Sequence, residues 1–107
     1  MKTIKHKNKE FRIYRWESKP FRDFKIPKGF KLAEHKDFIE LFDNKLINYP
    51  KKDWEIYFVK HYSKRKQKEG YISRLYLDGD SDLGSWGEAL ADSDDDGRVV
   101  VSREIEG

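Results

Sequence analysis

The chain has 107 residues and no cysteine, which excludes disulfides and thiolate metal sites. Charged residues make up 40% of it and aromatic residues 15%, and this aromatic share is enough for one small core. The sequence shows neither a membrane-spanning run nor a secretory signal, so we expect a soluble domain that is cytoplasmic or associated with a virion.

Residues 1–8 are predicted to be a flexible basic lead-in, followed by a single domain over residues 9–107. The first predicted strand is Phe11–Trp16, because apolar side chains occur on both of its faces and favour burial on both sides. Pro20 and Pro27 indicate turns before the next element.

The clearest predicted helix is Ala33–Asn44, because its apolar residues recur at three- and four-residue spacing. The apolar stripe comprises Phe38, Ile39, Leu41 and Phe42. The charged residues that we expect to face water are Glu34, Lys36, Asp37, Glu40 and Asp43.

The second half of the chain is predicted to be mostly strands. Residues 54–62 and 71–77 indicate a central antiparallel hairpin, with a basic turn at residues 64–70. A short strand is expected near residues 86–90, and the unbroken valines of residues 98–104 predict a buried C-terminal strand. The predicted fold class is therefore α+β, with one main amphipathic helix, a central hairpin and a buried last strand.

Residues 78–97, which we call the acidic tract, differ from the rest of the chain. Asp, Gly and Ser fill 14 of the 20 positions of the tract. Residues 1–77 contain 21 Lys and Arg against 10 Asp and Glu, whereas residues 78–107 contain 2 against 10. This division indicates two surfaces with different partners, and the acidic one favours a basic partner.

The tract has part of the pattern of a calcium loop. Asp92, Asp94 and Asp96 precede Gly97 as the first ligands of an EF-hand do, but Arg103 occupies the position where the loop needs a bidentate Glu. The earlier series from Asp78 to Asp82 lacks the required Gly. We therefore predict no metal site and no cofactor, with weak calcium binding at Asp92, Asp94 and Asp96 as an alternative.

Nucleic-acid binding is a second alternative. The basic turn could neutralise phosphates with Lys64, Arg65, Lys66 and Lys68. The tyrosines that could stack on bases are Tyr57, Tyr62 and Tyr71. An acidic face on the same small domain would repel a polyanion, so binding to nucleic acid is not the leading interpretation.

Catalytic residues are not recognisable in the chain. His35 and His61 lack the spacing of metal ligands, and the segment from Gly84 to Gly87 does not match a nucleophile elbow around Ser85. We expect a protein that is not an enzyme.

The order of elements resembles the C-type lectin fold in its compact prokaryotic form. Residues 26–33, Ile-Pro-Lys-Gly-Phe-Lys-Leu-Ala, are similar to the entry to the first helix of that fold, in which Phe38 and Leu41 would be packing residues. Residues 97–101, Gly-Arg-Val-Val-Val, resemble its terminal strand. The chain lacks the Glu-Pro-Asn and Trp-Asn-Asp motifs of calcium-dependent lectins and the catalytic cysteines of formylglycine-generating enzymes, so the resemblance implies neither activity.

Within this fold, the tract resembles the variable region of proteins diversified by retroelements. An error-prone reverse transcriptase randomises template adenines there, so that Asn codons yield Asp, Gly, Ser and other residues but never Trp or Glu. The resemblance implies a variable region over residues 72–98 that binds a ligand, and a framework of Trp86, Glu88 and Arg98. The positions implied to vary are Asp78, Gly79, Asp80, Ser81, Asp82, Ser85, Asp92, Ser93, Asp94, Asp95 and Asp96.

Arg74 and Tyr76 lie just before the tract and are candidate anchors for a ligand, because Arg and Tyr are common binding hot spots. The alternative is that Arg74 extends its stem along the surface and Tyr76 packs in the core. The ligand itself is not identified by the sequence, and the oligomeric state is open, with head-to-tail pairing of basic and acidic faces as one arrangement.

Overall fold

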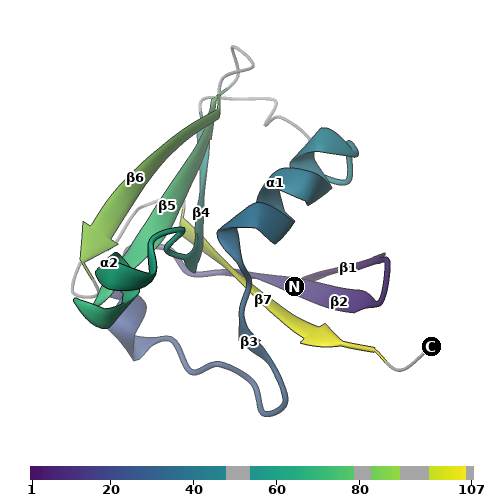
Figure 1. Ribbon diagram of the computed structural model, residues 1–107, viewed down its shortest axis with the longest axis horizontal. Helices are drawn as coiled ribbons and strands as arrows, with labels where there is room; N and C mark the ends of the chain where they lie inside the picture. The colour runs from purple at the N-terminus through teal and green to yellow at the C-terminus, as the bar shows by residue number, and fades with distance from the viewer. Residues whose placement is uncertain (48–53, 79–82, 90–96, 106–107) are drawn as a thin grey trace.

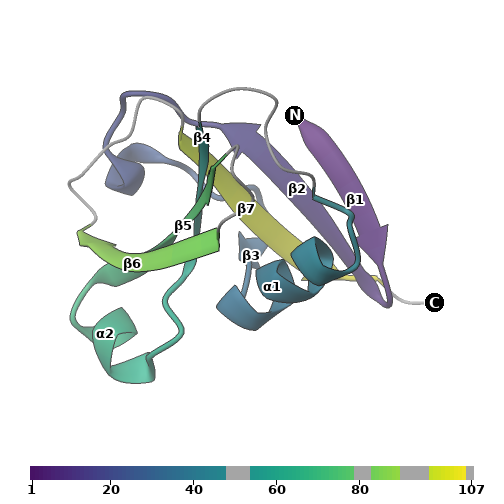
Figure 2. The same cartoon turned by 90° about the horizontal axis from the view of Figure 1, so that it is seen from above.

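The computed structural model describes residues 1–47, 54–78, 83–89 and 97–105, in which a curved sheet lies around one main helix, α1 (His35–Asp43), as Figures 1 and 2 show. The strands are β1 (Lys2–His6), β2 (Lys9–Arg15), β3 (Lys31–Leu32), β4 (Trp54–Lys60), β5 (Tyr71–Asp78), β6 (Leu83–Ala89) and β7 (Gly97–Glu104). Two short helical elements are η1 (Phe21–Asp23) and α2 (Lys64–Lys68). None of the described helices is long and apolar enough to cross a membrane.

Six strands follow one another in the order β1-β2-β7-β4-β5-β6, and the short β3 also pairs with β7. Every neighbouring pair is antiparallel except β4 and β7, which are parallel. Two strands pair with the same edge of β7: β4 lies along residues 97–99 of β7, and β3 lies along residues 101–102. Ala33, which follows β3, connects β7 with β4. Its N–H donates to the carbonyl of Val100 at 2.9 Å, and its carbonyl accepts from the N–H of Lys60 at 2.8 Å.

Both faces of the sheet are covered, as the apolar pattern of the strands predicts. On one face Val100 belongs to a cluster with Phe38 and Leu41 of α1. On the other face Val99 and Val101 belong to a second cluster, which η1 and the segment leading to β3 cover. All three valines are fully buried, so the predicted burial of the C-terminal strand is confirmed.

The predicted helix and its apolar stripe are confirmed, although α1 begins two residues later and ends one residue earlier than expected. Phe38 and Leu41 are fully buried, and the other two stripe residues pack partly against the same cluster. The expectation that Asp37 faces water is wrong. Its residue exposure is 9%, and its carboxylate accepts a hydrogen bond from Lys9 Nζ at 2.8 Å. The buried charge therefore has a partner that is distant in sequence.

Two other expectations need correction. Most of the predicted flexible lead-in forms β1, an edge strand that pairs with β2 and buries Ile4. The basic turn of the central hairpin contains the helix α2, because Ser63 caps it by accepting a hydrogen bond from the backbone N–H of Lys66 at 3.4 Å. The hairpin itself, formed by β4 and β5, is confirmed.

Candidate functional site

The acidic tract meets the described structure at four strand ends, of which three lie together; the fourth, Ala89 at the end of β6, stands opposite Tyr71 at the other end of β5. Asp78 ends β5 opposite Trp54, and Gly97 begins β7 opposite Ile56, which is only two residues further along β4. β6 begins at Leu83, beside the last residues of β5. Asp78, Leu83 and Gly97 therefore converge on one end of the sheet, although they are up to 19 positions apart in the chain.

Most of the predicted contact residues lie outside the described residues. These are Gly79, Asp80, Ser81, Asp82, Asp92, Ser93, Asp94, Asp95 and Asp96, and the calcium series of the sequence lies among them. Five others are placed only as backbone positions on β5 and β6: Tyr76, Asp78, Ser85, Trp86 and Glu88. The register sets Ser85 opposite Leu75, Trp86 opposite Arg74 and Glu88 opposite Ile72.

Arg74 and Arg98 lie on opposite faces of the sheet. Arg74 is half-buried and stands opposite Phe58, whose side chain belongs to the cluster on the η1 face. Arg98 stands opposite Tyr57, on the α1 face, and its guanidinium lies 5.9 Å from the centre of the Tyr57 ring. Residues directly opposite each other share a face. The two arginines therefore do not contribute to one binding surface.

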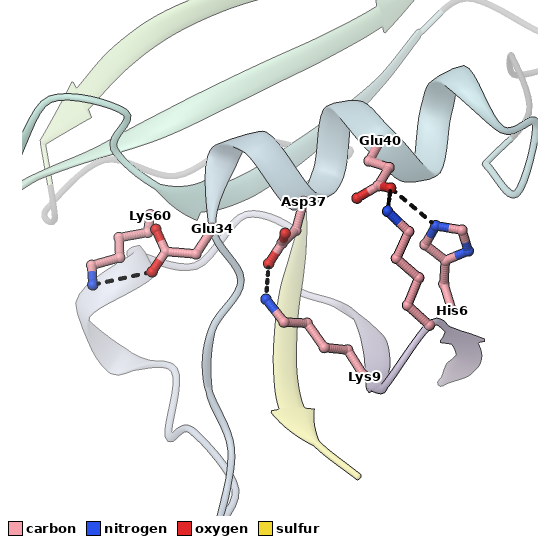
Figure 3. Close-up of polar contacts among 7 residues, drawn as sticks. His6, Lys9, Glu34, Asp37, Glu40 and Lys60 are labelled. Atoms are coloured by element: carbon pink, nitrogen blue, oxygen red, sulfur yellow. Dashed lines mark hydrogen bonds and ion pairs between the residues drawn. The ribbon is translucent and has the colours of Figure 1, made fainter. Parts of the chain in front are cut away.

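A group of ion pairs joins α1 to the hairpin of β1 and β2, as Figure 3 shows. Besides the pair of Lys9 and Asp37, His6 Nε2 lies 3.5 Å from Glu40 Oε1, and Lys7 also pairs with Glu40. These residues line a cavity of about 300 Å³ between the hairpin turn and α1.

The pKa values of Glu40 and Lys9 do not favour acid–base chemistry by these two residues near neutral pH. The hydrogen bond from Lys7 holds the pKa of Glu40 below its ordinary 4.5, and the hydrogen bond to Asp37 raises the pKa of Lys9 above 10.5. A general acid or base works best with a pKa near the operating pH. We therefore interpret the pairs as contacts that fasten the helix to the sheet.

The other two histidines form an aromatic group with Tyr62. The rings of His61 and Tyr62 stack with centroids 4.5 Å apart, and the His35 ring meets Tyr62 edge-on at 5.4 Å. Burial lowers the pKa of both histidines below 6.5; the neighbouring His61 adds to the effect on His35, and Lys66 adds to that on His61. Among the described residues, no three His, Asp or Glu side chains are grouped so that they could hold a metal ion.

The sequence does not predict a groove of about 290 Å³ beside α2. Its lining comes from five separate elements or their flanks, and no local motif unites them. The residues that line it are Phe21, Lys31, Leu32, Lys60, His61, Gln67, Gly70, Tyr71 and Ile72. The only sequence signal for it is the proximity of Tyr62 and Tyr71 to a basic segment.

No protein-family model matches the chain. No curated protein and no solved structure is detectably similar to it.

Proposed function

We propose that the domain binds a macromolecular ligand through its acidic tract, and that the tract is the variable region of a protein diversified by a retroelement. The scaffold would be a compact form of the C-type lectin fold. Trp86, Glu88 and Arg98 would stay fixed, while the Asp, Ser and Gly positions of the tract change from one variant to another.

The architecture supports a scaffold of this kind. An opening strand, an entry segment, one main helix and a closing strand follow in the order that the resemblance implies, and β2 pairs with β7 along seven positions. The two apolar clusters contain buried residues from β1, β2, α1, β4, β5 and β7 and cover both faces of the sheet. A core assembled from segments that flank the tract can tolerate changes within it.

The convergence of Asp78, Leu83 and Gly97 at one end of β4 is the observation that favours this proposal most. Because both groups of exchangeable positions adjoin these strand ends, their side chains could act on one ligand. Arg74 is next to Trp86 in the register, so it could contribute an anchor from the adjoining face of β5.

The DNA around the coding sequence provides the test. The proposal expects a reverse-transcriptase gene nearby and a near-copy of the codons for residues 72–98 that differs from them only at adenines. Absence of such a copy, or differences at other bases, would remove the retroelement from the proposal. Binding by the tract would then have to be tested separately, with variants in which Asp80 and Asp82 become Asn.

Nucleic-acid binding is a second candidate function, which the geometry of α2 favours. Lys64, Arg65, Lys66 and Lys68 are all exposed on this short helix, and the side chain of Tyr62 next to it is also exposed. Binding of a fluorescent single-stranded oligonucleotide at low salt, lost when Lys64, Arg65 and Lys66 become Ala, would support this function. Equal binding by the wild type and the triple variant would exclude it.

A further inference from the structure

The groove beside α2 has an apolar floor. Phe21 and Ile72 are buried residues of the cluster on the η1 face, and Leu32 packs partly against the same cluster. Tyr71 stands at the rim with 39% of its surface exposed. A groove whose floor continues the core favours a flat apolar group over a purely polar one.

The polar groups of the groove are cations and hydrogen-bonding side chains. Lys31 and Lys60 line it, and no Asp or Glu is among the described side chains that do so. Lys60 has a carboxylate partner, since its Nζ lies 3.5 Å from Glu34 Oε1, whereas Lys31 is exposed and has no ion pair among the described residues. A third ammonium group, that of Lys66, lies 5.0 Å from the centre of the Tyr71 ring and pairs with Glu69 Oε2 at 3.3 Å. Lys31, the one of these three lysines without a carboxylate partner among the described residues, therefore favours an anion.

One wall of the groove is held in place by hydrogen bonds. The backbone N–H of Ser63 donates to His61 Nδ1 at 3.0 Å, so the neutral ring carries its proton on Nε2. The side-chain amide of Gln67 donates to the backbone carbonyl of His61 and ties α2 to this wall. His61 is only 5% exposed, and burial lowers its pKa below 6.5. These hydrogen bonds fix the orientation of the His61 ring and hold α2 against it.

We propose that this groove is a binding site for a small anion that carries a flat apolar ring, such as an aromatic carboxylate. The ring would lie on the floor of Phe21, Leu32 and Ile72, next to Tyr71. The anionic group would face Lys31 and Lys60. This site lies beside β6, because Ala89 stands opposite Tyr71 and Glu88 opposite Ile72, but its occupancy does not depend on the function proposed for the tract.

The direct test follows the backbone amides of the labelled protein by NMR during titration with 2-naphthoate. We expect saturable shifts at Leu32, Gln67, Tyr71 and Ile72, with a Kd of about 1 mM or below. The uncharged 2-naphthamide should bind more weakly, and acetate, which has no ring, should cause no such shifts. Equal binding of the amide and the carboxylate would overturn the role given to the lysines.

Variants separate the local charges from the general basicity of the chain. Lys31→Ala should weaken 2-naphthoate binding about threefold, and Lys31→Ala with Lys60→Ala about tenfold, as expected for exposed ion pairs. The matched control is Lys5→Ala, an exposed lysine on the edge strand β1, which should leave the affinity unchanged. Unchanged affinity in the double variant, or shifts at other amides, would show that the groove is not the site.

A thymidine oligonucleotide is the last arm of the experiment. If it shifts the same four amides while 2-naphthoate does not, the surface is a site for single-stranded nucleic acid and the proposal is wrong. If 2-naphthoate binds and the oligonucleotide does not compete with it, the site takes small anions as proposed.

Discussion

The contact between Lys9 and Asp37 should contribute more to stability than the exposed ion pairs of the domain. Lys9 Nζ lies 2.8 Å from Asp37 Oδ2, and the two side chains are 29% and 11% exposed. Lys9→Met keeps most of the aliphatic stem and removes the ammonium group. The largely buried carboxylate of Asp37, between the hairpin and α1, would then lose this donor (Figure 3).

The expected loss in the free energy of unfolding depends on how well water can replace the lost hydrogen-bond donor. A hydrogen bond between charged groups contributes about 1.5–3 kcal/mol when it is shielded from water. Asp37 lines a cavity of about 300 Å³, which gives water access to its carboxylate. We therefore expect Lys9→Met to lower the free energy of unfolding by about 1.5 kcal/mol at pH 7, the lower end of that range. This corresponds to a fall in Tm of about 9 °C for a domain of this size.

Arg65→Met is the matched control. Arg65 Nε lies 3.4 Å from Glu69 Oε1 across one turn of α2, but the arginine side chain is 88% exposed. Such a pair contributes about 0.3 kcal/mol, and 1 M salt should remove most of it. Urea unfolding of both variants, with Asp37→Asn and the double variant of Lys9 and Asp37 to complete a thermodynamic cycle, measures the difference.

The pH dependence of the same pair gives an independent check. The hydrogen bond to Asp37 raises the pKa of Lys9 above 10.5, so its stabilising contribution is complete below pH 10.5 and is lost as the pH rises through the raised value. If Lys9→Met costs no more than Arg65→Met, or if the cycle gives no coupling between Lys9 and Asp37, the reasoning is refuted.

Three further predictions concern the core, a histidine and a turn. Phe38→Ala should cost about 3–5 kcal/mol by urea unfolding, because the ring is fully buried between α1 and the sheet; a cost under 1 kcal/mol would contradict this packing. Because burial lowers the pKa of His61 below 6.5, the unfolded chain binds more protons and the urea midpoint should fall as the pH drops through 6.5. His61→Asn, which keeps an acceptor for the Ser63 N–H, should reduce that fall, and an unchanged fall would exclude His61 as its source. Gly29→Ala should cost about 1 kcal/mol through backbone strain alone, because its φ is +86° and nothing lies within 4 Å of an added Cβ; a neutral effect on the urea midpoint would contradict that strain.

The elements that sequence predicts best are those with a strong local pattern. An unbroken run of valines at 99–101 and an apolar stripe containing Phe38 and Leu41 both predict burial, and the structure confirms that these residues are buried. β1 has no such pattern, because its single buried apolar residue, Ile4, stands among lysines and a histidine. Its strand conformation depends on pairing with β2, which the local sequence does not encode strongly.

The remaining differences come from contacts between distant segments. Asp37 is buried because Lys9, 28 residues away, supplies a partner, and a helical pattern alone assigns such a charge to the solvent side. The sequence predicts a turn in place of α2 because the lysines match a turn composition, although Ser63 is a capping signal that favours a helix. The groove beside α2 could not be predicted, since it exists only where η1, β3, β4, α2 and β5 meet.

The candidate tract was recognised from composition alone, and the structure adds the positions of its ends. Composition does not reveal that Asp78 and Gly97 lie two positions apart along β4. Only the pairing of the strands provides that information. The identity of the residues that contact a ligand stays a prediction.

A folding screen can measure whether the scaffold is independent of the side chains at the exchangeable positions of the tract. Residues 79–82 and 92–96 would be randomised together in a displayed library, which would be challenged with protease at rising temperature and then sequenced. A matched library would randomise Val99, Val100 and Val101. We predict that most tract variants resist the protease as well as the parent does, while nearly all valine variants are lost. Loss of the tract variants as often as the valine variants would contradict it.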